Sequence, residues 1–455
     1  FYKGNLSCLL VYSFTCLLKP IYIILYMHTL RKFLFLLLLM SPFLANASAK
    51  DFIKQRDTHF YKGDARQPYY FVGTNLWYAP ILASEGQGGD LPRLCRELDS
   101  LKNIGVDNLR ILVGADAGSA NVTSVAPVLQ SKPGVLNDTL LAGLDRMLAE
   151  LEKRDMYAVL YLTNSWDWSG GFGYYLRETG HGDSPDASGD GWSSYVDYAA
   201  EFFRDRQAQQ LYFDFVKTIV GRTNGITGKA YKDDAHIMAW QLCNEPRPFA
   251  KELGGAFVKW VSEAAALIKS IDPNHLVSTG SEGIIGCNVD EQLCERVHAD
   301  RNIDYITVHI WPANWGWAKR GSLHSSLPHV FLKTEEYISA HDRMAQKLQK
   351  PFVIEEFGYP RDANAYSPAA TTDSRNAFYG CIFQALTDSR AQNGALAGCN
   401  FWGWGGSGRA RAERWTAGDD FLCDPPHEPQ GWYSVFDTDR QTIDLIRQTA
   451  NKLHE

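Results

Sequence analysis

Long runs of charge of one sign are missing from this sequence of 455 residues. Lys and Arg together number 45 and Asp and Glu 52, which gives a formal net charge of −7. Because the chain has no basic run and no basic stripe interleaved with aromatic residues, nucleic acid is not an expected partner. The hydrophobic share of 45% also excludes an intrinsically disordered chain.

Cysteine is scarce, with nine residues, seven of them after position 49. Their spacings match no zinc pattern such as paired C-x2-C, so we expect no metal, and no cofactor is needed either. An odd number excludes complete internal pairing, although Cys287 and Cys294 lie near enough in the chain to close one loop through a disulfide.

Residues 27–49 have the three parts of a secretory signal. Arg31 and Lys32 form the charged end, residues 33–40 form the apolar core, and the small residues of "ANASA" offer a cleavage site. We therefore expect the mature chain to be exported and to begin near residue 48–50.

Residues 1–26 are expected to be a translated upstream extension rather than part of the protein. The alternative is a membrane anchor formed by "LLVYSFTCLLKPIYIILY", but Lys19 and Pro20 interrupt this run and a second apolar stretch follows directly. With the signal removed, we expect no membrane association, and residues 50–455 form the expected single catalytic domain.

Neither an internal repeat nor a low-complexity linker divides residues 50–455, and no G-x-G-x-x-G follows the first expected strand. Short β-rich runs alternate instead with longer helical patterns. The expected strands are 69–76, 107–114, 157–164, 237–244, 276–283, 305–311, 352–358 and 396–404. The expected helices are 91–104, 140–154, 208–221, 255–271, 334–350, 373–389 and 439–453. Apolar strands without alternation are typical of a parallel sheet covered on both faces, so a (β/α)8 barrel is predicted, with a doubly wound open sheet as the main alternative.

Three long segments rich in Trp, Tyr and Gly follow expected strands, namely 165–202, 312–331 and 405–436. The whole chain holds 13 Trp, 22 Tyr and 23 Phe, more than a large core alone explains in such polar surroundings. In a (β/α)8 barrel these segments would lie at the active-site face. We expect them to be loops that form a groove for a chain-like substrate, because sugar rings stack on aromatic faces.

Two glutamates stand at the ends of opposite expected strands, Glu245 after the fourth and Glu356 at the end of the seventh. A lone Glu there would most simply be a solvated loop residue, but two could converge over the barrel, as retaining glycoside hydrolysis requires. Arg110 is a charge inside an apolar strand and needs a partner, so we expect it to keep Glu356 ionised. Glu355 alternates to the other side of its strand and is expected to face the helices.

Further polar and aromatic residues lie at the same strand ends. Asn244 could hydrogen-bond the sugar hydroxyl next to the reacting carbon, and His309 could orient a carboxyl group or a substrate hydroxyl. Trp402, in "CNFWGW", would supply a platform for the sugar being cleaved.

Taken together, "NEP" after the fourth strand, "EFG" after the seventh, and the Arg, His and Trp just described resemble glycoside hydrolase family 5. The resemblance covers residues 52–455. It implies a (β/α)8 fold and a retaining mechanism, with Glu245 as acid/base, Glu356 as nucleophile, and Arg110, Asn244, His309 and Trp402 supporting them.

Within that family the chain looks similar to the endo-β-1,4-mannanase branch. The stretches "NEPRP", "STGSEG" and "TNSWDWSGG" carry this resemblance. The residues implied to line the mannan-binding cleft are Arg247, Glu282, Asn164 and Trp166. Trp77 and Trp311 are also expected to bind substrate. The expected partner is therefore a β-mannan polysaccharide or oligosaccharide, bound by a monomer.

One position departs from the family pattern. Many members carry Tyr two residues after the strand-six His, where this chain has Trp311. An indole can only donate a hydrogen bond, so the hydrogen bonding of the nucleophile must differ or come from another residue. Two alternatives to a mannanase stay open, a β-1,4-glucanase of the same family and a barrel that only binds polysaccharide.

Overall fold

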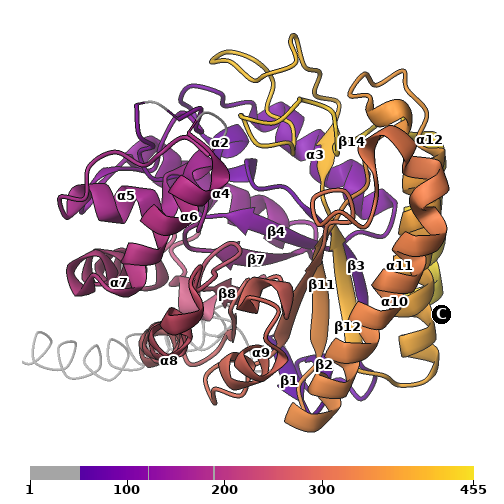
Figure 1. Ribbon diagram of the computed structural model, residues 1–455, viewed down its shortest axis with the longest axis horizontal. Coiled ribbons are helices and arrows are strands. Elements are labelled where there is room, and N and C mark those ends of the chain that lie inside the picture. Colours follow the sequence, from indigo (N-terminus) through magenta and orange to yellow (C-terminus); the bar gives the residue numbers. More distant parts are fainter. Residues whose placement is uncertain (1–51, 121, 188–189, 455) are drawn as a thin grey trace, which may run out of the picture. The chain divides into compact units, whose positions relative to one another are not determined.

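Eight parallel strands form the central sheet of the protein (Figure 1). They are β3 (Phe71–Asn75), β4 (Asn108–Leu112), β7 (Tyr157–Tyr161), β8 (Ile237–Gln241), β9 (Leu276–Ser278), β10 (Ile306–Ile310), β11 (Phe352–Phe357) and β12 (Leu396–Phe401). Every residue of these strands is buried. All eight predicted strands are therefore confirmed. Each ends earlier than expected, and β3, β4 and β10 also begin one or two residues later.

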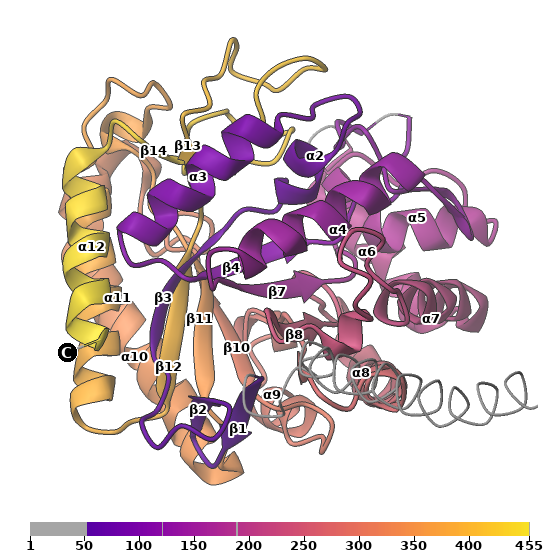
Figure 2. The same cartoon turned by 180° about the vertical axis from the view of Figure 1, so that it is seen from behind.

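The strands curve into a nearly closed barrel in the order β10-β11-β12-β3-β4-β7-β8-β9. Between β9 and β10 the gap is bridged by hydrogen bonds, among them Asp304 N to Val277 O at 2.8 Å and the hydroxyls of Thr279 and Thr307 at 3.0 Å. The predicted (β/α)8 architecture is confirmed, because helices surround this parallel sheet (Figures 1 and 2).

The computed structural model describes residues 52–120, 122–187 and 190–454, which belong to one compact unit. The predicted signal (27–49) and extension (1–26) lie outside the described residues. Within the described part of the chain, no helix has both the length and the apolar character needed to span a membrane.

Among the described residues, seven α-helices match the predicted ones, and four more were not predicted. The predicted ones are α3 (Leu91–Asn103), α4 (Asp138–Glu152), α7 (Arg206–Val220), α8 (Gly254–Ile271), α10 (Leu323–Leu348), α11 (Asp373–Ala391) and α12 (Arg440–His454). The others are α2 (Ala79–Ala83), α5 (Gly171–Glu178), α6 (Trp192–Ala200) and α9 (Glu291–His298).

Side-chain caps lie at the N-terminal ends of several helices. Asp90, Asn137, Asp205 and Asp290 accept hydrogen bonds from the first backbone N–H groups of α3, α4, α7 and α9.

Two segments expected to be loops are partly helical. The segment 165–202 contains α5 and α6, and the segment 312–331 contains the start of α10. The start of α10 was not predicted because it contains Pro328, and a proline usually ends a helix. Here the proline lies within the first two turns of the helix.

A hairpin fills the N-terminal end of the barrel. Its strands β1 (Ile53–Arg56) and β2 (His59–Lys62) pair antiparallel. Ile53 and Phe60 pack against residues near the N-terminal ends of the barrel strands, such as Phe71 and Met238, in a separate apolar cluster. This plug leaves the C-terminal end of the barrel as the open one.

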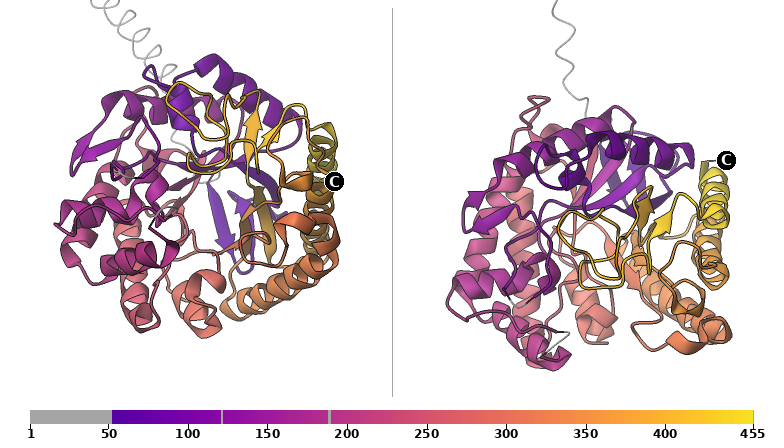
Figure 3. Two further views of the ribbon diagram at one scale, coloured as in Figure 1. Left: turned by 45° about the horizontal axis from the view of Figure 1, so that its top comes forward. Right: turned by 90° about the horizontal axis from the view of Figure 1, so that it is seen from above.

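The segment 405–434 crosses the C-terminal end of the barrel, and Figure 3 shows it near the centre of the view from above. Its ends are joined by β13 (Trp404–Gly406) and β14 (Val435–Phe436), and a further hairpin, β5 (Gln130–Lys132) and β6 (Val135–Leu136), follows β4. Trp77 donates from its indole N–H to the carbonyl of Cys423 at 2.8 Å, which ties this segment to the end of β3.

Candidate active site

Glu245 lies just past the end of β8 in a left-handed backbone conformation, with φ +50°. Such a conformation is costly for a residue with a side chain, so its surroundings must hold it in place. Its N–H donates to Gly280 O at 2.9 Å, and the Ser165 hydroxyl donates to its carbonyl at 2.6 Å. Pro246 follows and cannot extend the strand pairing. The carboxyl group of Glu245 is therefore directed by bonds from both neighbouring strand ends.

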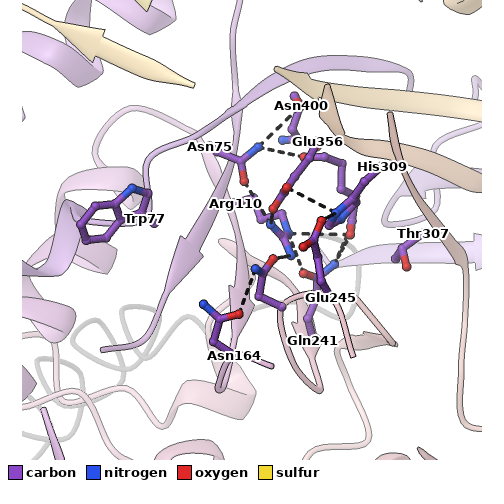
Figure 4. Close-up of polar contacts among 12 residues, drawn as sticks. Asn75, Trp77, Arg110, Asn164, Gln241, Glu245, Thr307, His309, Glu356 and Asn400 are labelled. Atoms are coloured by element: carbon purple, nitrogen blue, oxygen red, sulfur yellow. Dashed lines mark hydrogen bonds and ion pairs between the residues drawn. The ribbon is translucent and has the colours of Figure 1, made fainter. Parts of the chain in front are cut away.

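Glu356, on β11, brings its carboxylate close to that of Glu245, and His309 of β10 joins the two (Figure 4). His309 Nδ1 lies 2.8 Å from Glu245 Oε1 and 3.3 Å from Glu356 Oε2. One nitrogen of His309 and one carboxylate oxygen from each glutamate lie within 4.8 Å of one another. The structure thus brings together the two glutamates that the sequence placed on opposite strands.

Arg110, on β4, is fully buried and uses its whole guanidinium group. It contacts Glu356 Oε1 at 2.5 Å and donates to the side-chain oxygens of Gln241 at 2.8 Å, Asn244 at 2.8 Å and Asn75 at 3.2 Å. The predicted ion pair with Glu356 is present, and all three guanidinium nitrogens of Arg110 donate to acceptors in this buried site.

Glu355 does not face the helices as expected. It is buried inside the barrel, where Gln241 Nε2 donates to its carboxylate at 2.5 Å and the Tyr305 hydroxyl does so at 3.0 Å. The register between β10 and β11 shifts here, since Val308 pairs with Ile354 but His309 pairs with Glu356. A β-bulge of this kind inserts one residue, so strict alternation fails and both glutamates point inward.

Burial and the neighbouring charges change the pKa of both carboxyl groups. Burial raises the pKa of Glu245 above its ordinary value. Burial raises the pKa of Glu356 well above its ordinary value, while Arg110 acts to lower it. Two carboxyls this close do not ionise together easily, and the Arg110 guanidinium contacts Glu356 directly, which favours the ionised form of that carboxyl.

His309 is a neutral imidazole in this site. Burial, followed by the positive charge of Arg110, lowers its pKa well below the ordinary value. A neutral ring with a proton on Nδ1 can donate to the carboxylates, and its Nε2 has no hydrogen-bond partner among the described residues.

An indole N–H group donates to each carboxyl group. Trp166 Nε1 lies 2.5 Å from Glu245 Oε2, and Trp311 Nε1 lies 3.2 Å from Glu356 Oε2. Many family members have a tyrosine at this position, and Trp311 supplies a hydrogen bond to Glu356 in its place.

The chain of this protein has clear relatives. The model of the glycoside hydrolase family 5 β-mannosidase-like group matches residues 50–455. The chain belongs to glycoside hydrolase family 5. Relatives with curated descriptions include the putative mannan endo-1,4-beta-mannosidase 9 of Oryza sativa subsp. japonica, which is 30% identical over 84% of this chain and 87% of its own.

Solved structures of family 5 proteins share the fold. The glycoside hydrolase family 5 mannosidase from Rhizomucor miehei has a TM-score of 0.82 and 32% identity, covering 90% of this chain and 98% of its own. The endo-beta-1,4-mannanase from Thermotoga petrophila has a TM-score of 0.62 at 24% identity, over 84% and 76% of the two chains. That second likeness establishes the fold alone.

The family 5 site opens into a cavity of about 390 Å³ at the C-terminal end of the barrel. Most of the predicted site residues line it: Asn244, Glu245, Arg247, Glu282, Trp166, Trp311, Glu356 and Trp402. Arg247 forms a two-point ion pair with Glu282, whose near oxygen is 2.5 Å from Arg247 Nε, and its guanidinium lies 5.3 Å from the Trp166 ring centre. Arg247 is thus held at the cavity wall on the Glu245 side.

Four predicted residues do not line the cavity. Arg110 and His309 are buried and contact the two glutamates. Asn164 is fully buried behind Asn244, whose amide donates to it at 3.1 Å, and it therefore positions Asn244. Trp77 is buried against Trp168 and, as Figure 4 shows, lies apart from the carboxylate cluster. Its indole holds the 405–434 segment instead of substrate.

Sequence reasoning missed several residues of the site. Gln241 and Asn75 orient Arg110, and a polar residue inside an apolar strand could have signalled both. His427 and Glu428 line the cavity from the 405–434 segment, and burial raises the pKa of Glu428 to about 8. Nothing in the sequence indicated which residues of that segment turn inward.

The described residues contain one group with metal-ligand spacing, formed by Glu245, His309 and Glu356. Arg110 already neutralises Glu356, and His309 directs Nδ1 at the carboxylates, so the donor set is used for hydrogen bonds. The arrangement suits proton transfer and nucleophilic attack rather than cation binding.

Proposed function

We propose that the protein hydrolyses β-1,4-mannosidic bonds of mannan, galactomannan or glucomannan with retention of configuration. The observation that carries the proposal is the Glu245–Glu356 pair, whose oxygens approach within 4.8 Å. Retaining enzymes hold their two carboxyls about 5–5.5 Å apart, while inverting enzymes need roughly 6.5–9.5 Å to admit a water molecule.

The reaction follows from the two protonation states. Glu356, ionised beside Arg110, attacks the anomeric carbon, while Glu245 gives its proton to the departing glycosidic oxygen. In the second step Glu245 takes a proton from water, and the resulting hydroxide displaces Glu356 from the sugar. His309 and Trp166 keep the Glu245 carboxyl in place through both steps.

We propose mannan as the substrate and internal bonds as the point of attack. The curated relatives at about 30% identity are described as mannan endo-1,4-beta-mannosidases, and a mutant of the Rhizomucor miehei protein was solved with mannosyl-fructose. Arg247 and Glu282 add polar groups to the aromatic wall of the cavity.

A second candidate is removal of single mannose units from a chain end. Two observations favour it. The 405–434 segment contributes Arg414, Pro425, His427 and Glu428 to the cavity wall, and a wall of this kind shortens a groove. The Rhizomucor miehei relative with a TM-score of 0.82 is described as a mannosidase.

Two substitutions test the chemistry. Glu356→Ala and Glu245→Gln should each lower kcat on mannan by at least about 10³-fold without loss of fold, because each removes one of the two reacting groups. Glu263→Gln, on the outside of α8, is the matched control. Near wild-type hydrolysis by either variant would refute the assignment.

Product analysis separates the substrates and the two modes. The protein is incubated with linear mannan, galactomannan and carboxymethyl-cellulose, and new reducing ends and released sugars are measured over time. Internal cleavage gives mixed oligosaccharides early, while end-cleavage gives mannose alone. Release from cellulose only would favour a glucanase, and no release from any polymer would favour a binding protein.

We also propose that the protein is exported. The basic-apolar-small pattern over residues 27–49 supports this, and the family match begins at residue 50, directly after the expected signal.

A further inference from the structure

Trp192 is an exposed tryptophan at the wall of the catalytic cavity. It is the first residue of α6, and 54% of its surface is exposed. Among the described residues, the other large apolar side chains with comparable exposure are Val135, Ile226, Val289, Leu332 and Tyr366, none of which lines this cavity. An exposed indole at the wall of a cavity indicates a binding surface, because exposed apolar side chains at concave sites commonly contact a ligand.

The Trp192 ring is held in position from beneath. It lies 4.9 Å from the Trp166 ring centre at an interplanar angle of 37°, and 6.2 Å from the ring of Tyr195. Tyr195 is fully buried, and its hydroxyl donates to the carbonyl of Ser165. One face of the indole is therefore supported by fixed aromatic rings, which lowers the entropy lost when a ligand packs on the exposed part.

The contacts of Trp192 show on which side of the cavity it lies relative to the two glutamates. Trp192 contacts Trp166, and Trp166 donates its N–H to Glu245. Trp311 and Trp402 pack together on the other side, where Trp311 donates to Glu356. Trp192 thus belongs to the Glu245 side of the cavity.

Under the proposed function, on which this inference rests, Glu245 protonates the oxygen that leaves. The sugar attached to that oxygen must then lie on the Glu245 side, next to Trp166 and Arg247. We propose that Trp192 is a stacking platform for a sugar unit beyond this first leaving-group sugar. The platform would serve internal cleavage and end-cleavage alike, because both release a chain on that side.

The test compares Trp192→Ala with the wild type on a long and a short substrate. Mannohexaose can extend over Trp192, whereas an aryl β-mannoside or aryl β-mannobioside has only an aryl leaving group. We expect kcat/KM for mannohexaose to fall about tenfold, mainly through KM, and to fall clearly less for the aryl substrate. Trp192→Phe should restore most of the loss because it keeps an aromatic face.

Leu332→Ala, an exposed apolar residue on α10 away from the cavity, is the control and should leave both substrates unchanged. Equal losses on both substrates would overturn the proposal, because they would mean that Trp192 only supports Trp166 and Glu245. No loss on mannohexaose would overturn it as well. If the wild type cleaves neither substrate, the proposed function itself fails, which is a separate result.

Discussion

The N–H of Trp311 supplies a hydrogen bond to Glu356 that cannot be lost by ionisation. A tyrosine hydroxyl can accept as well as donate, whereas an indole only donates. The ring is fixed by an edge contact with Tyr433 at 5.0 Å, and the Tyr433 hydroxyl is 3.0 Å from Asn314 Oδ1. Trp311 therefore favours the carboxylate form of Glu356 at every pH at which the protein is folded.

Trp311→Phe should move the acidic limb of the pH profile upward. A donor to the ionised form lowers the pKa of a carboxyl, so its removal raises the pKa of Glu356. Since the nucleophile must be ionised, the variant should lose kcat/KM at a higher pH than the wild type does, with about tenfold lower activity at acidic pH.

The measurement is kcat/KM across the pH range for Trp311→Phe beside Trp315→Phe. Trp315 comes from the same segment and lines the same cavity, but among the described residues its indole donates to neither of the two carboxyl groups. An acidic limb that moves equally in both variants, or in neither, would show that Trp311 acts by packing alone.

Secondary-structure elements were predictable where one physical rule dominates. The eight barrel strands are continuous apolar runs because both faces are covered, and this pattern is visible in the sequence. Glu245, Glu356 and Arg110 stand out because a charge inside an apolar strand or at its end must be compensated by a partner or serve a function. These features were sufficient to predict the barrel and the centre of the site.

Features that depend on several elements at once were not predictable. The inward turn of Glu355 depends on a bulge between β10 and β11, which no property of "FVIEEFG" reveals. Trp77 was expected to bind substrate, but its indole N–H donates to the carbonyl of Cys423 in the distant 405–434 segment. Tertiary contacts of this kind decide the direction of a side chain without leaving a local signal.

At the level of elements, α11 holds the 405–434 segment over the barrel through Arg375. This fully buried guanidinium donates to the carbonyls of Trp432 at 2.7 Å, Tyr359 at 2.9 Å and Ser434 at 3.1 Å. Arg375→Met would remove this donor from the buried carbonyls of Trp432 and Tyr359, while the Ser434 carbonyl keeps Arg361 at 3.1 Å, at a total cost of about 3 kcal/mol. For about 400 residues this corresponds to a Tm lower by about 4 °C.

Calorimetry measures the Tm, and limited proteolysis reports cleavage within 405–434, which should become faster in Arg375→Met. Arg447→Met, on the outer face of α12 in a half-exposed pair with Asp444, is the matched control and should change the Tm little. A variant of Arg375 as stable and as protease-resistant as the wild type would show that other contacts suffice to hold the segment.

At the level of the whole molecule, the expected maturation can be read from the mass of the exported protein. When the full chain is expressed with export, the product should begin between residues 48 and 50, because cleavage follows small residues after an apolar core. Intact-mass measurement of the secreted fraction checks this. A product that retains residues 27–49 would contradict the signal assignment, and one that retains 1–26 would contradict the upstream extension.

The partners of Arg110 also set the order in which activity can appear during folding. Its guanidinium joins Asn75, Gln241 and Glu356, which lie 35, 131 and 246 positions away along the chain. Contacts over such distances form late, because closing long loops is slow. A chain whose barrel has not yet closed contains both glutamates but does not hold their carboxyl groups beside each other against Arg110 and His309. Hydrolysis thus becomes possible only once the barrel has closed, so the enzyme does not act before it is complete.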